Sequence, residues 1–426
     1  MDVSVRPGPL SGTVNIIPSK SQAHRALICA ALADDFTHII CDTTSKDIDA
    51  TAACLRALGA GIRYDHDGFY VDPITREYNT DNNQVILPCG ESGSTYRFML
   101  PVAGALGREA SFELEGRLPQ RPLSPLYEEL SGNGCILSPQ GSNPFKIKGQ
   151  LKPGSYSLDA GVSSQFISGL LFALPLLNES SELLLTGSIE SYPYIELTLA
   201  MLEKFSIEAV LKDMKFSIPG RQVYKSPGKI YVEGDWSNAA FWLAAGAIGG
   251  NGITCTGLDL RSRQGDRAVL DILSRFGAVV ESNSSAVTVS GGELKGIEID
   301  ARDIPDLVPI LSVVAAAAKG ESVFYNAGRL RGKESDRLAA VSSVLNELGA
   351  DIRETGDGLI VNGGASLKGA AVSSWGDHRI AMSSAIAAVL CKNPVVIQGG
   401  EAVNKSYPRF FEERDRLVCH HSTGEI

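Results

Sequence analysis

Leu348-Gly349-Ala350-Asp351-Ile352-Arg353 joins the end of a predicted helix, a glycine turn and the start of a predicted strand pair. The same pattern recurs at four earlier places, spaced 71 to 74 residues apart: Leu58–Arg63, Gly132–Leu137, Phe205–Val210 and Phe276–Glu281. A period of this length is typical of a repeated supersecondary unit. The sequence therefore predicts a chain of about six such units.

Each repeat is long enough for two strand–helix segments and a hairpin, which predicts an α/β or α+β fold with mixed sheets. After the helix-like stretch 409–417 the chain ends before a sixth strand pair can form. We expect the strand-like pieces Val3–Val5 and Gly12–Ile17, which no helix precedes, to supply the missing strands. The chain would then cross twice between two domains, one of residues 1–17 plus 232–426 and one of residues 18–231.

The composition is that of a globular protein, with 44% apolar residues, and no apolar run reaches the roughly 18 residues of a membrane span. Met1–Pro7 lacks the basic and apolar regions of a signal peptide, so we expect a cytoplasmic location. The net charge of −10 argues against a nucleic-acid partner, although a local cation cluster can still bind a small anion.

Several kinds of site are not indicated. The eight cysteines are scattered without zinc-site spacing, and most are expected to be small core residues: 29, 41, 54, 89, 135, 255, 391 and 419. The motifs of phosphate loops, dinucleotide sites, zinc proteases and serine hydrolases are absent. We therefore expect no metal site.

Nine residues, Arg329 to Arg337, carry six charges between the predicted strand Val323–Tyr325 and a predicted helix. We expect Lys333, Glu334 and Arg337 at or within the first helical turn, where free backbone N–H groups favour an anion. Lys333 and Arg337 would then share one helical face. The alternative is a solvated helix start with internal ion pairs.

Other predicted strand-to-helix turns carry similar residues. Lys20, Ser21 and Arg25 place two cations and a hydroxyl at a helix start, and Cys89–Arg97 adds glycines that let backbone amides approach an anion. Each turn alone is equally consistent with a simple helix cap. The further turns of this kind are 117–122, 159–165, 375–379 and 404–408. Together the turns predict that helix N-termini from both halves converge in a cleft between the domains and bind a substrate, or a pair of substrates, with two anionic groups.

Taken in order, these motifs resemble those of the enolpyruvyl transferase family. The resemblance extends from Pro18-Ser19-Lys20-Ser21 to Lys405 and rests on PSKSxxxR, GxSGxxxR, SSQ, SxPY, IPD, KESDR and GDHRxAM. The family implies six βαβαββ units, three in each of two domains, with the active site in the interdomain cleft and the N-terminal strands in the C-terminal domain. This arrangement agrees with the repeat period described above.

Within the family, the chain is more similar to the branch that acts on shikimate 3-phosphate than to the branch that acts on UDP-N-acetylglucosamine. The second branch has a lysine–asparagine pair at Lys20-Ser21 and a reactive cysteine in the loop that here runs from Arg117 to Leu126, which holds no cysteine. The resemblance implies an enzyme that transfers the enolpyruvyl group of phosphoenolpyruvate to the 5-hydroxyl of shikimate 3-phosphate. Phosphate is released on the route to chorismate and aromatic amino acids. It implies no cofactor, and we expect a monomer.

The resemblance also assigns site residues. Asp306 is the expected base toward the 5-hydroxyl, Glu334 handles the proton at the enolpyruvyl carbon, and Lys20 completes the catalytic set. The residues expected to contact shikimate 3-phosphate are Lys20, Ser21, Arg25, Ser163, Ser164, Gln165, Ser191, Asp306 and Lys333. Those expected around phosphoenolpyruvate are Lys20, Gly93, Arg121, Gln165, Arg337, Arg379 and Lys405.

Two other functional classes stay open at this stage. A two-domain anion-binding protein without catalysis would use the cations but would not need Asp306 and Glu334. A purely structural repeat protein would not need charged turns in every unit. The nucleotide-sugar branch also remains an alternative to the shikimate branch.

Overall fold

The protein is represented by a computed structural model that describes residues 1–74, 84–284 and 286–418. The chain divides into two compact units, here called unit 1 (Met1–Ile17 with Glu233–Ile426) and unit 2 (Pro18–Val232). Each unit has its own hydrophobic core. Across the described ranges, a search for a helix long and apolar enough to cross a membrane finds none.

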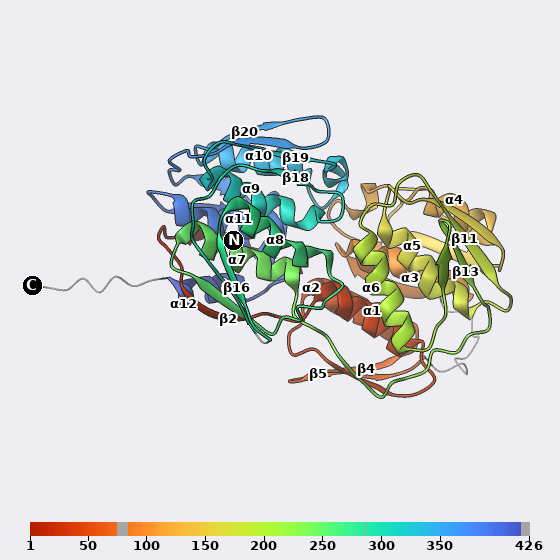
Figure 1. The fold of residues 1–426 in the computed structure, drawn as a ribbon. Helices are drawn as coiled ribbons and strands as arrows, with labels where there is room; N and C mark the ends of the chain where they lie inside the picture. Colours follow the sequence, from red (N-terminus) through yellow and green to blue (C-terminus); the bar gives the residue numbers. More distant parts are fainter. Residues whose placement is uncertain (75–83, 285, 419–426) are drawn as a thin grey trace, which may run out of the picture. The chain divides into compact units, whose positions relative to one another are not determined.

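Unit 2 holds three sheets with one common plan (Figure 1). In each, one pair of strands is parallel, and a hairpin strand pairs antiparallel with one of them. The parallel partners follow one another along the chain in β6–β7 and β10–β11, whereas β14 and β3 lie far apart in the sequence. The strand orders are β14-β3-β5-β4, β6-β7-β9-β8 and β10-β11-β13-β12. The strands are β3 (Thr37–Ile40), β4 (Gly61–Asp65), β5 (Gly68–Asp72), β6 (Val85–Gly90), β7 (Ala110–Leu114), β8 (Cys135–Leu137), β9 (Phe145–Gly149), β10 (Ser155–Asp159), β11 (Ser181–Thr186), β12 (Val210–Lys212), β13 (Lys215–Ile218) and β14 (Lys229–Tyr231).

Unit 1 follows the same plan, with strand orders β16-β17-β15-β2, β18-β19-β21-β20 and β1-β23-β22. The repeat predicted from the sequence period and the mixed α/β class are therefore confirmed. The strands are β1 (Val3–Val5), β2 (Gly12–Asn15), β15 (Ile253–Thr256), β16 (Val279–Ser282), β17 (Ala286–Ser290), β18 (Glu298–Asp300), β19 (Glu321–Tyr325), β20 (Asp351–Glu354), β21 (Leu359–Asn362), β22 (Ala371–Ser373) and β23 (Val395–Gln398).

The two N-terminal strands complete two different sheets. β1 pairs antiparallel with β23 and so fills the place of a hairpin strand in the last sheet. β2 pairs in parallel with β15 at the edge of the sheet opposite β16, and Figure 1 shows α12 beside it. The expectation that both pieces complete the last sheet is therefore wrong for β2. The reason is that β2 and β14 exchange sheets. β14, the strand before α7 in the chain, pairs with β3 in unit 2, and the edge of β15 that it leaves vacant in unit 1 is filled by β2.

Two helices belong to each repeat. Those of unit 2 are α1 (Lys20–Ala31), α2 (Lys46–Ala57), α3 (Gly93–Ala105), α4 (Leu126–Gly132), α5 (Ser164–Ala173) and α6 (Tyr192–Lys204), with the 3₁₀ turns η1 (Leu118–Gln120) and η2 (Leu174–Leu176). Those of unit 1 are α7 (Trp236–Gly249), α8 (Val269–Phe276), α9 (Val308–Ala317), α10 (Arg337–Glu347), α11 (His378–Ala387) and α12 (Phe410–Leu417), with η3 (Gly265–Ala268), η4 (Pro305–Leu307), η5 (Gly328–Gly332), η6 (Ala388–Leu390) and η7 (Gly400–Lys405).

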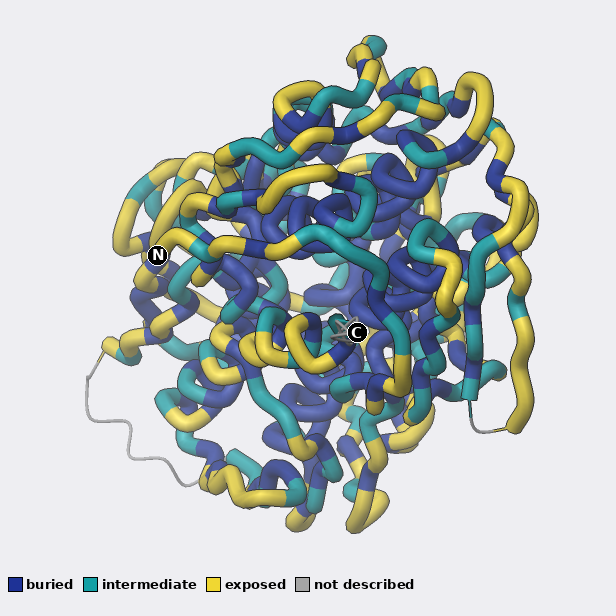
Figure 2. The backbone as a smooth tube through the Cα atoms, turned by 90° about the vertical axis from the view of Figure 1, so that its left-hand side faces the viewer, coloured by how far each residue is buried: buried dark blue, intermediate teal, exposed yellow. Residues whose placement is uncertain are grey.

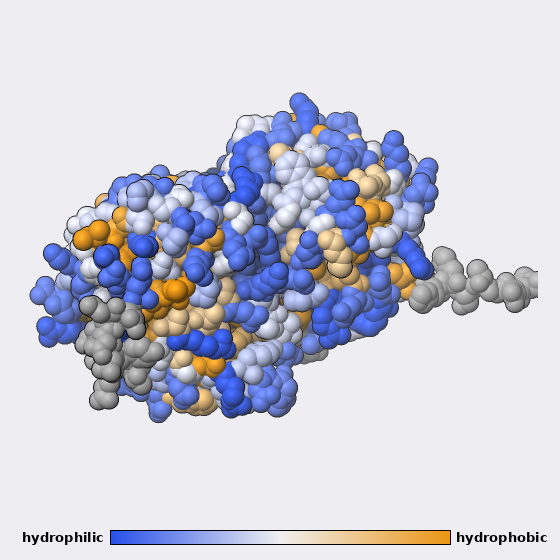
Figure 3. Space-filling view, turned by 180° about the vertical axis from the view of Figure 1, so that it is seen from behind, coloured by the Kyte–Doolittle hydropathy of each residue, from blue (hydrophilic) through white to orange (hydrophobic). Residues whose placement is uncertain are grey.

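The first helix of most repeats is buried on nearly all sides. In α9, for example, every residue from Val308 to Ala316 is buried, as expected for a helix that is apolar all round. Figure 2 shows such buried backbone inside each unit and exposed backbone in the outer loops. On the face drawn in Figure 3, hydrophobic surface is broken into small areas between hydrophilic ones.

Seven cysteines lie in these cores as free, buried thiols, in agreement with the sequence-based expectation. Cys419 lies outside the described residues.

Four of the five predicted turns contain glycine and lie between the second helix and the hairpin of their repeat, and in the turn at Phe205–Val210 Ser206 adopts a positive φ of 59° instead. Gly277 ends α8 with a φ of 104°, and a Cβ atom there would lie 2.4 Å from the carbonyl oxygen of Glu293. A side chain at this position therefore meets both an unfavourable backbone region and a collision with the backbone. This explains why the turn after α8 needs glycine.

We predict that Gly277→Ala lowers the free energy of unfolding by about 1–3 kcal/mol, because the alanine must occupy the left-handed region and displace Glu293. Urea denaturation measures this change. Gly132→Ala is the matched control, since Gly132 is helical, meets nothing within 4 Å, and should gain up to about 1 kcal/mol. Equal effects at the two sites would contradict the role assigned to Gly277.

Candidate active site

A buried guanidinium lies at the centre of the charged cluster in unit 1. Arg337, the first residue of α10, is 2% exposed and contacts three carboxylates at 2.8 Å each. They are Asp306 of η4, Glu334 before α10, and Asp377 at the start of α11. Burial alone would lower the pKa of Arg337, but these carboxylates outweigh it and raise that pKa. Three separate segments are thus fixed around one cation.

Asp306 bridges two arginines. Its Oδ1 accepts from Arg337 and its Oδ2 from Arg379 Nη2 at 2.7 Å. Burial alone would raise the pKa of the Asp306 carboxyl, but the positive charges of Arg379, Arg337 and Lys333 outweigh it and hold that pKa well below its ordinary value. The two arginines therefore hold Asp306 in its ionised form and make it a weak base.

The segment before α10 differs from the sequence-based expectation. The helix begins at Arg337, with Asp336 as its N-cap accepting from the amide of Ala339, so Lys333 and Glu334 precede the first turn. The prediction that Lys333 and Arg337 share one helical face is therefore wrong. The Ser335 hydroxyl donates to Asp377 instead of capping the helix, which leaves the cap to Asp336.

Lys333 nevertheless belongs to the cluster. Burial lowers the pKa of Lys333 to about 8, against the opposing attraction of Asp306. Lys405, the last residue of η7, donates from Nζ to the carbonyl of Gly376 at 2.8 Å, beside the turn that carries Arg379. Unit 1 thus brings together Asp306, Lys333, Glu334, Arg337, Arg379 and Lys405.

In unit 2, cations also lie at helix N-termini. Lys20 begins α1 and pairs with Asp47 of α2 at 2.9 Å, with both side chains largely buried. Gly93 begins α3, where Ser92 caps the helix by accepting from the amide of Thr95. A Cβ atom on Gly93 would lie 2.7 Å from Nη1 of Arg121, so the glycine lets that guanidinium approach the helix end.

Gln165 is held in one orientation by its neighbours. Its Oε1 accepts from Arg97 Nη1 at 2.6 Å, and its Nε2 donates to Ser94 Oγ at 2.9 Å. Arg97 also donates to the carbonyl of Pro122, next to Arg121. Ser163 caps α5, and Ser164 is the first residue of that helix. These bonds link the Gly93 turn, the Arg121 loop and the start of α5.

Arg25 is buried and hydrogen-bonded to protein groups, as a structural side chain would be. It is 2% exposed, and it donates to Thr198 Oγ1 at 2.8 Å and to the carbonyls of Ser21 and Tyr194. Burial lowers its pKa to about 10. Arg25 therefore joins α1 to the start of α6, where Ser191 adopts a positive φ of 55°.

Sequence reasoning missed two structural members of these clusters, Asp377 and Arg97. Both stand inside motifs that the sequence singled out, GDHRxAM and GxSGxxxR. A buried aspartate that both caps a helix and pairs with an arginine has no distinctive sequence pattern of its own, because aspartate at a helix start is common on surfaces as well.

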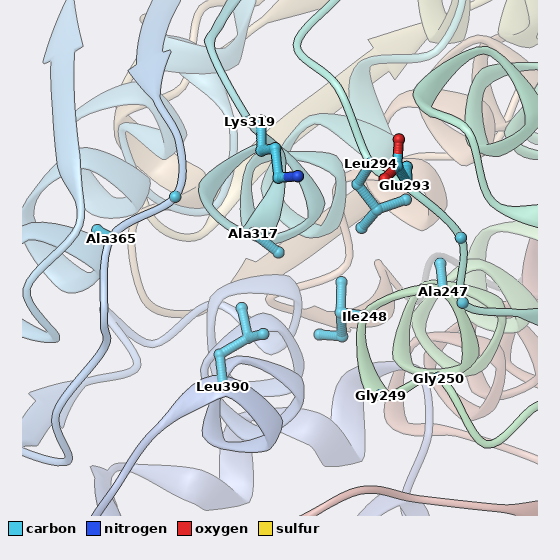
Figure 4. A pocket seen from close by; sticks show the side chains of 13 residues that line it. Ala247, Ile248, Gly249, Gly250, Glu293, Leu294, Ala317, Lys319, Ala365 and Leu390 are labelled. Carbon is cyan, nitrogen blue, oxygen red and sulfur yellow. The ribbon is translucent and has the colours of Figure 1, made fainter.

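A separate hollow of about 640 Å³ lies in unit 1 (Figure 4). Ile248 of α7, Ala317 of α9 and Leu390 of η6 line it, together with glycine backbone. Its charged side chains, Glu293 and Lys319, are exposed, and the predicted site residues are not among those that line it. No group of three or more His, Cys, Asp or Glu residues in the described part of the chain is arranged to hold a metal ion.

The similarity of this chain to known proteins extends over nearly its whole length. Residues 5–413 match the family described as EPSP synthase (3-phosphoshikimate 1-carboxyvinyltransferase). The chain is 43% identical over 413 residues to a 3-phosphoshikimate 1-carboxyvinyltransferase of Clostridium kluyveri, with 96% of each protein covered. It is 44% identical over 429 residues to the protein of that name from Clostridium acetobutylicum, with 99% of each covered.

Solved structures give the same result. An EPSP synthase from Acinetobacter baumannii superimposes with a TM-score of 0.81 at 26% identity, with 98% of each chain covered. The enolpyruvyl transferase NikO from Streptomyces tendae superimposes with a TM-score of 0.77 at 18% identity, over 97% of this chain and 96% of the other. At that identity the second likeness concerns the fold alone.

We predict that Asp377→Ala lowers the free energy of unfolding by about 3–5 kcal/mol, because it leaves the buried Arg337 without its most buried partner. Urea denaturation of the purified variant measures the loss. Lys215→Ala is the control, since it removes an exposed ion pair with Glu182 worth at most about 1 kcal/mol. A loss below about 1 kcal/mol at Asp377 would show that Arg337 does not depend on it.

Proposed function

This chain belongs to the EPSP synthase (3-phosphoshikimate 1-carboxyvinyltransferase) family, and we propose which of its side chains carry out the reaction of that family. The enzyme transfers the enolpyruvyl group of phosphoenolpyruvate to the 5-hydroxyl of shikimate 3-phosphate and releases phosphate. This transfer belongs to the shikimate pathway, which leads to aromatic amino acids.

The cations at helix starts are proposed to bind phosphoenolpyruvate. Arg337 and Arg379 in unit 1 are buried and rigidly held, and their planar guanidinium groups suit carboxylate and phosphate oxygens. Lys405, and in unit 2 Lys20, Arg121, Gln165 and the Gly93 amide, would complete the contacts to the same substrate. Fixed cations of this kind also stabilise the phosphate that departs.

The observation that carries the proposal is the double ion pair of Asp306 with Arg337 and Arg379. A carboxylate held by two arginines is a weak base, because its protonated form is disfavoured. A phosphoenolpyruvate anion that engages both arginines would reduce their pull on Asp306. The pKa of Asp306 would then rise, and its carboxylate could accept the proton of the 5-hydroxyl.

Addition to the enolpyruvyl group also needs an acid. Glu334, whose Oε2 accepts from Arg337 Nη2, is proposed to deliver the proton, in its protonated form, to the methylene carbon while the 5-hydroxyl oxygen bonds to C2. The Glu334 carboxylate then takes a proton back from the methyl carbon of the tetrahedral intermediate as the C2–O bond to phosphate breaks, which restores the vinyl double bond. The residues proposed for shikimate 3-phosphate are Lys20, Ser21, Arg25, Ser163, Ser164, Gln165, Ser191, Asp306 and Lys333.

Arg25 is proposed to act partly through others. Its three guanidinium nitrogen atoms are already hydrogen-bonded to protein groups, so its contribution would include holding the Ser21 and Tyr194 backbone in place.

We further propose that the enzyme works as a cytoplasmic monomer. A size-exclusion mass near that of one chain would support the monomer, and a mass near twice that value would oppose it.

We predict that the purified protein releases phosphate from phosphoenolpyruvate only when shikimate 3-phosphate is present, because the acceptor hydroxyl must add before phosphate can leave. A colorimetric phosphate assay with each substrate alone and with both measures this. UDP-N-acetylglucosamine is the competing acceptor. Release with the nucleotide sugar but not with shikimate 3-phosphate would move the chain to the other branch of the fold family.

We predict that Asp306→Asn lowers kcat by about 10²–10⁴-fold, since an amide cannot accept the hydroxyl proton. Binding of phosphoenolpyruvate should be kept or tightened, because the change frees Arg337 and Arg379 from a competing carboxylate. Steady-state kinetics and isothermal titration calorimetry measure the two effects. Asp351→Asn, on the exposed edge strand β20, is the control with unchanged kcat. Full turnover by Asp306→Asn would favour a protein that binds anions without Asp306 as base.

A further inference from the structure

A continuous chain of buried hydrogen bonds joins three helices of unit 2. His24 Nδ1 lies 2.7 Å from Thr51 Oγ1, Thr51 Oγ1 lies 2.7 Å from Thr95 Oγ1, and Thr95 Oγ1 donates to Ser92 Oγ at 2.7 Å. His24 belongs to α1, Thr51 to α2 and Thr95 to α3. All four side chains are at most 1% exposed. Neither the predicted site nor the proposed mechanism uses any of them.

The direction of the chain follows from proton counting. The Thr95 hydroxyl gives its one proton to Ser92, so Thr51 must donate to Thr95, and His24 must donate to Thr51 from Nδ1–H. Burial, followed by the charges of Lys20 and Arg25, lowers the pKa of His24 well below its ordinary value, so the ring carries only this one proton. Its Nε2 makes no hydrogen bond to the described residues, and the ring meets Phe98 edge to face.

His24 stands one helical turn from Lys20, and Ser92 stands next to Gly93, two residues that we place at phosphoenolpyruvate; Thr51 stands one turn from Asp47, the ion-pair partner of Lys20. Lys20 precedes His24 by four residues in α1, and Asp47 precedes Thr51 by four residues in α2, so each pair shares a helix face. The Lys20–Asp47 ion pair therefore links α1 to α2 one helical turn before the His24–Thr51 bond, nearer the N-termini of the two helices. Ser92 and Thr95 enclose Gly93 at the start of α3.

The chain also explains why the three helix ends keep their spacing. Ala23 and Ala52, the sequence neighbours of His24 and Thr51, are small and buried, and side chains of this size do not by themselves specify one register between α1 and α2. A directional hydrogen-bond chain does specify one, because each buried donor has one nearest acceptor. The carbonyl oxygen of Asp47 lies 3.4 Å from Thr95 Oγ1, but the one proton of that hydroxyl goes to the nearer Ser92.

We propose that Thr51 is a positioning residue whose hydroxyl, as the middle link of the His24–Thr51–Thr95–Ser92 chain, fixes the distance between Lys20 and the Gly93 amide. This inference rests on the proposal that Lys20 and Gly93 contact phosphoenolpyruvate. Loss of the hydroxyl would leave the buried His24 N–H without an acceptor and would remove the donor from which Thr95 Oγ1 accepts, and the helix starts would shift to satisfy these groups.

Steady-state kinetics of Thr51→Val and Thr51→Ser test the inference. Valine keeps the shape and removes the hydroxyl, so kcat/KM for phosphoenolpyruvate should fall about tenfold or more. Serine keeps the hydroxyl and should stay within about threefold of the parent. Thr254→Val is the matched control, because it breaks a similar hydroxyl pair with Thr288 on β15 and β17 of unit 1, and it should leave kcat/KM within about twofold. A merely structural role of Thr51 would lower the melting temperature without this loss in the folded enzyme.

A second pair decides the matter if Thr51→Val does not fold. His24→Asn can still donate from a position close to Nδ1, whereas His24→Leu cannot, so the leucine variant should lose at least about fivefold more kcat/KM than the asparagine variant. Equal values for this pair, or a Thr51→Val enzyme with unchanged kcat/KM, would overturn the inference. Lys20→Met distinguishes a failure of this inference from a failure of the proposed site. Unchanged kinetics in Lys20→Met would refute the assignment of Lys20 to phosphoenolpyruvate, and the inference with it. Lower kcat/KM in Lys20→Met together with unchanged kcat/KM in Thr51→Val would refute the inference alone.

Discussion

Burial of the Arg337 guanidinium is the constraint on which the candidate site of unit 1 depends. A charge removed from water must be paired, and here the partners come from η4, from the segment before α10 and from the start of α11. The requirement to surround one cation therefore fixes three segments that lie far apart in the sequence. Asp377 completes the set and also caps α11, so the position of Arg379 depends on the same carboxylate.

Both units place cations at helix starts, where the helix dipole disfavours them. Lys20 begins α1, Arg337 begins α10, and Arg379 is the second residue of α11. Each is held there by a carboxylate, Asp47 for the first and Asp306 for the other two. A substrate anion would be favoured by the dipole and the cation together, so it can compete with these carboxylates. The proposed rise in the basicity of Asp306 is a direct consequence of that competition.

Much of the fold could be predicted from the sequence because the repeat period and the glycine turns are local patterns. The position of β2 could not, since the exchange of β2 and β14 between sheets leaves no local mark and is decided by which sheet edge is vacant. The residue types of the site were likewise visible in motifs such as KESDR. The start of α10 was expected too early, with Lys333 and Glu334 at or within the first turn, whereas Asp336 caps the helix and its first residue is Arg337. The role of Arg97 depends on Gln165, 68 residues away, and the role of Thr51 depends on Thr95, 44 residues away. No sequence pattern links the members of either pair.

The most direct test of the central claim is an NMR titration of the Asp306 carboxyl carbon, with and without phosphoenolpyruvate and in the absence of acceptor. The signal is assigned by its loss in Asp306→Asn. The account predicts that the free protein keeps Asp306 ionised well below the ordinary aspartate pKa of about 3.9, and that the ligand raises its pKa by at least about one unit, which corresponds to about 1.4 kcal/mol. An ordinary pKa in the free protein, or one that the ligand leaves unchanged, would contradict it.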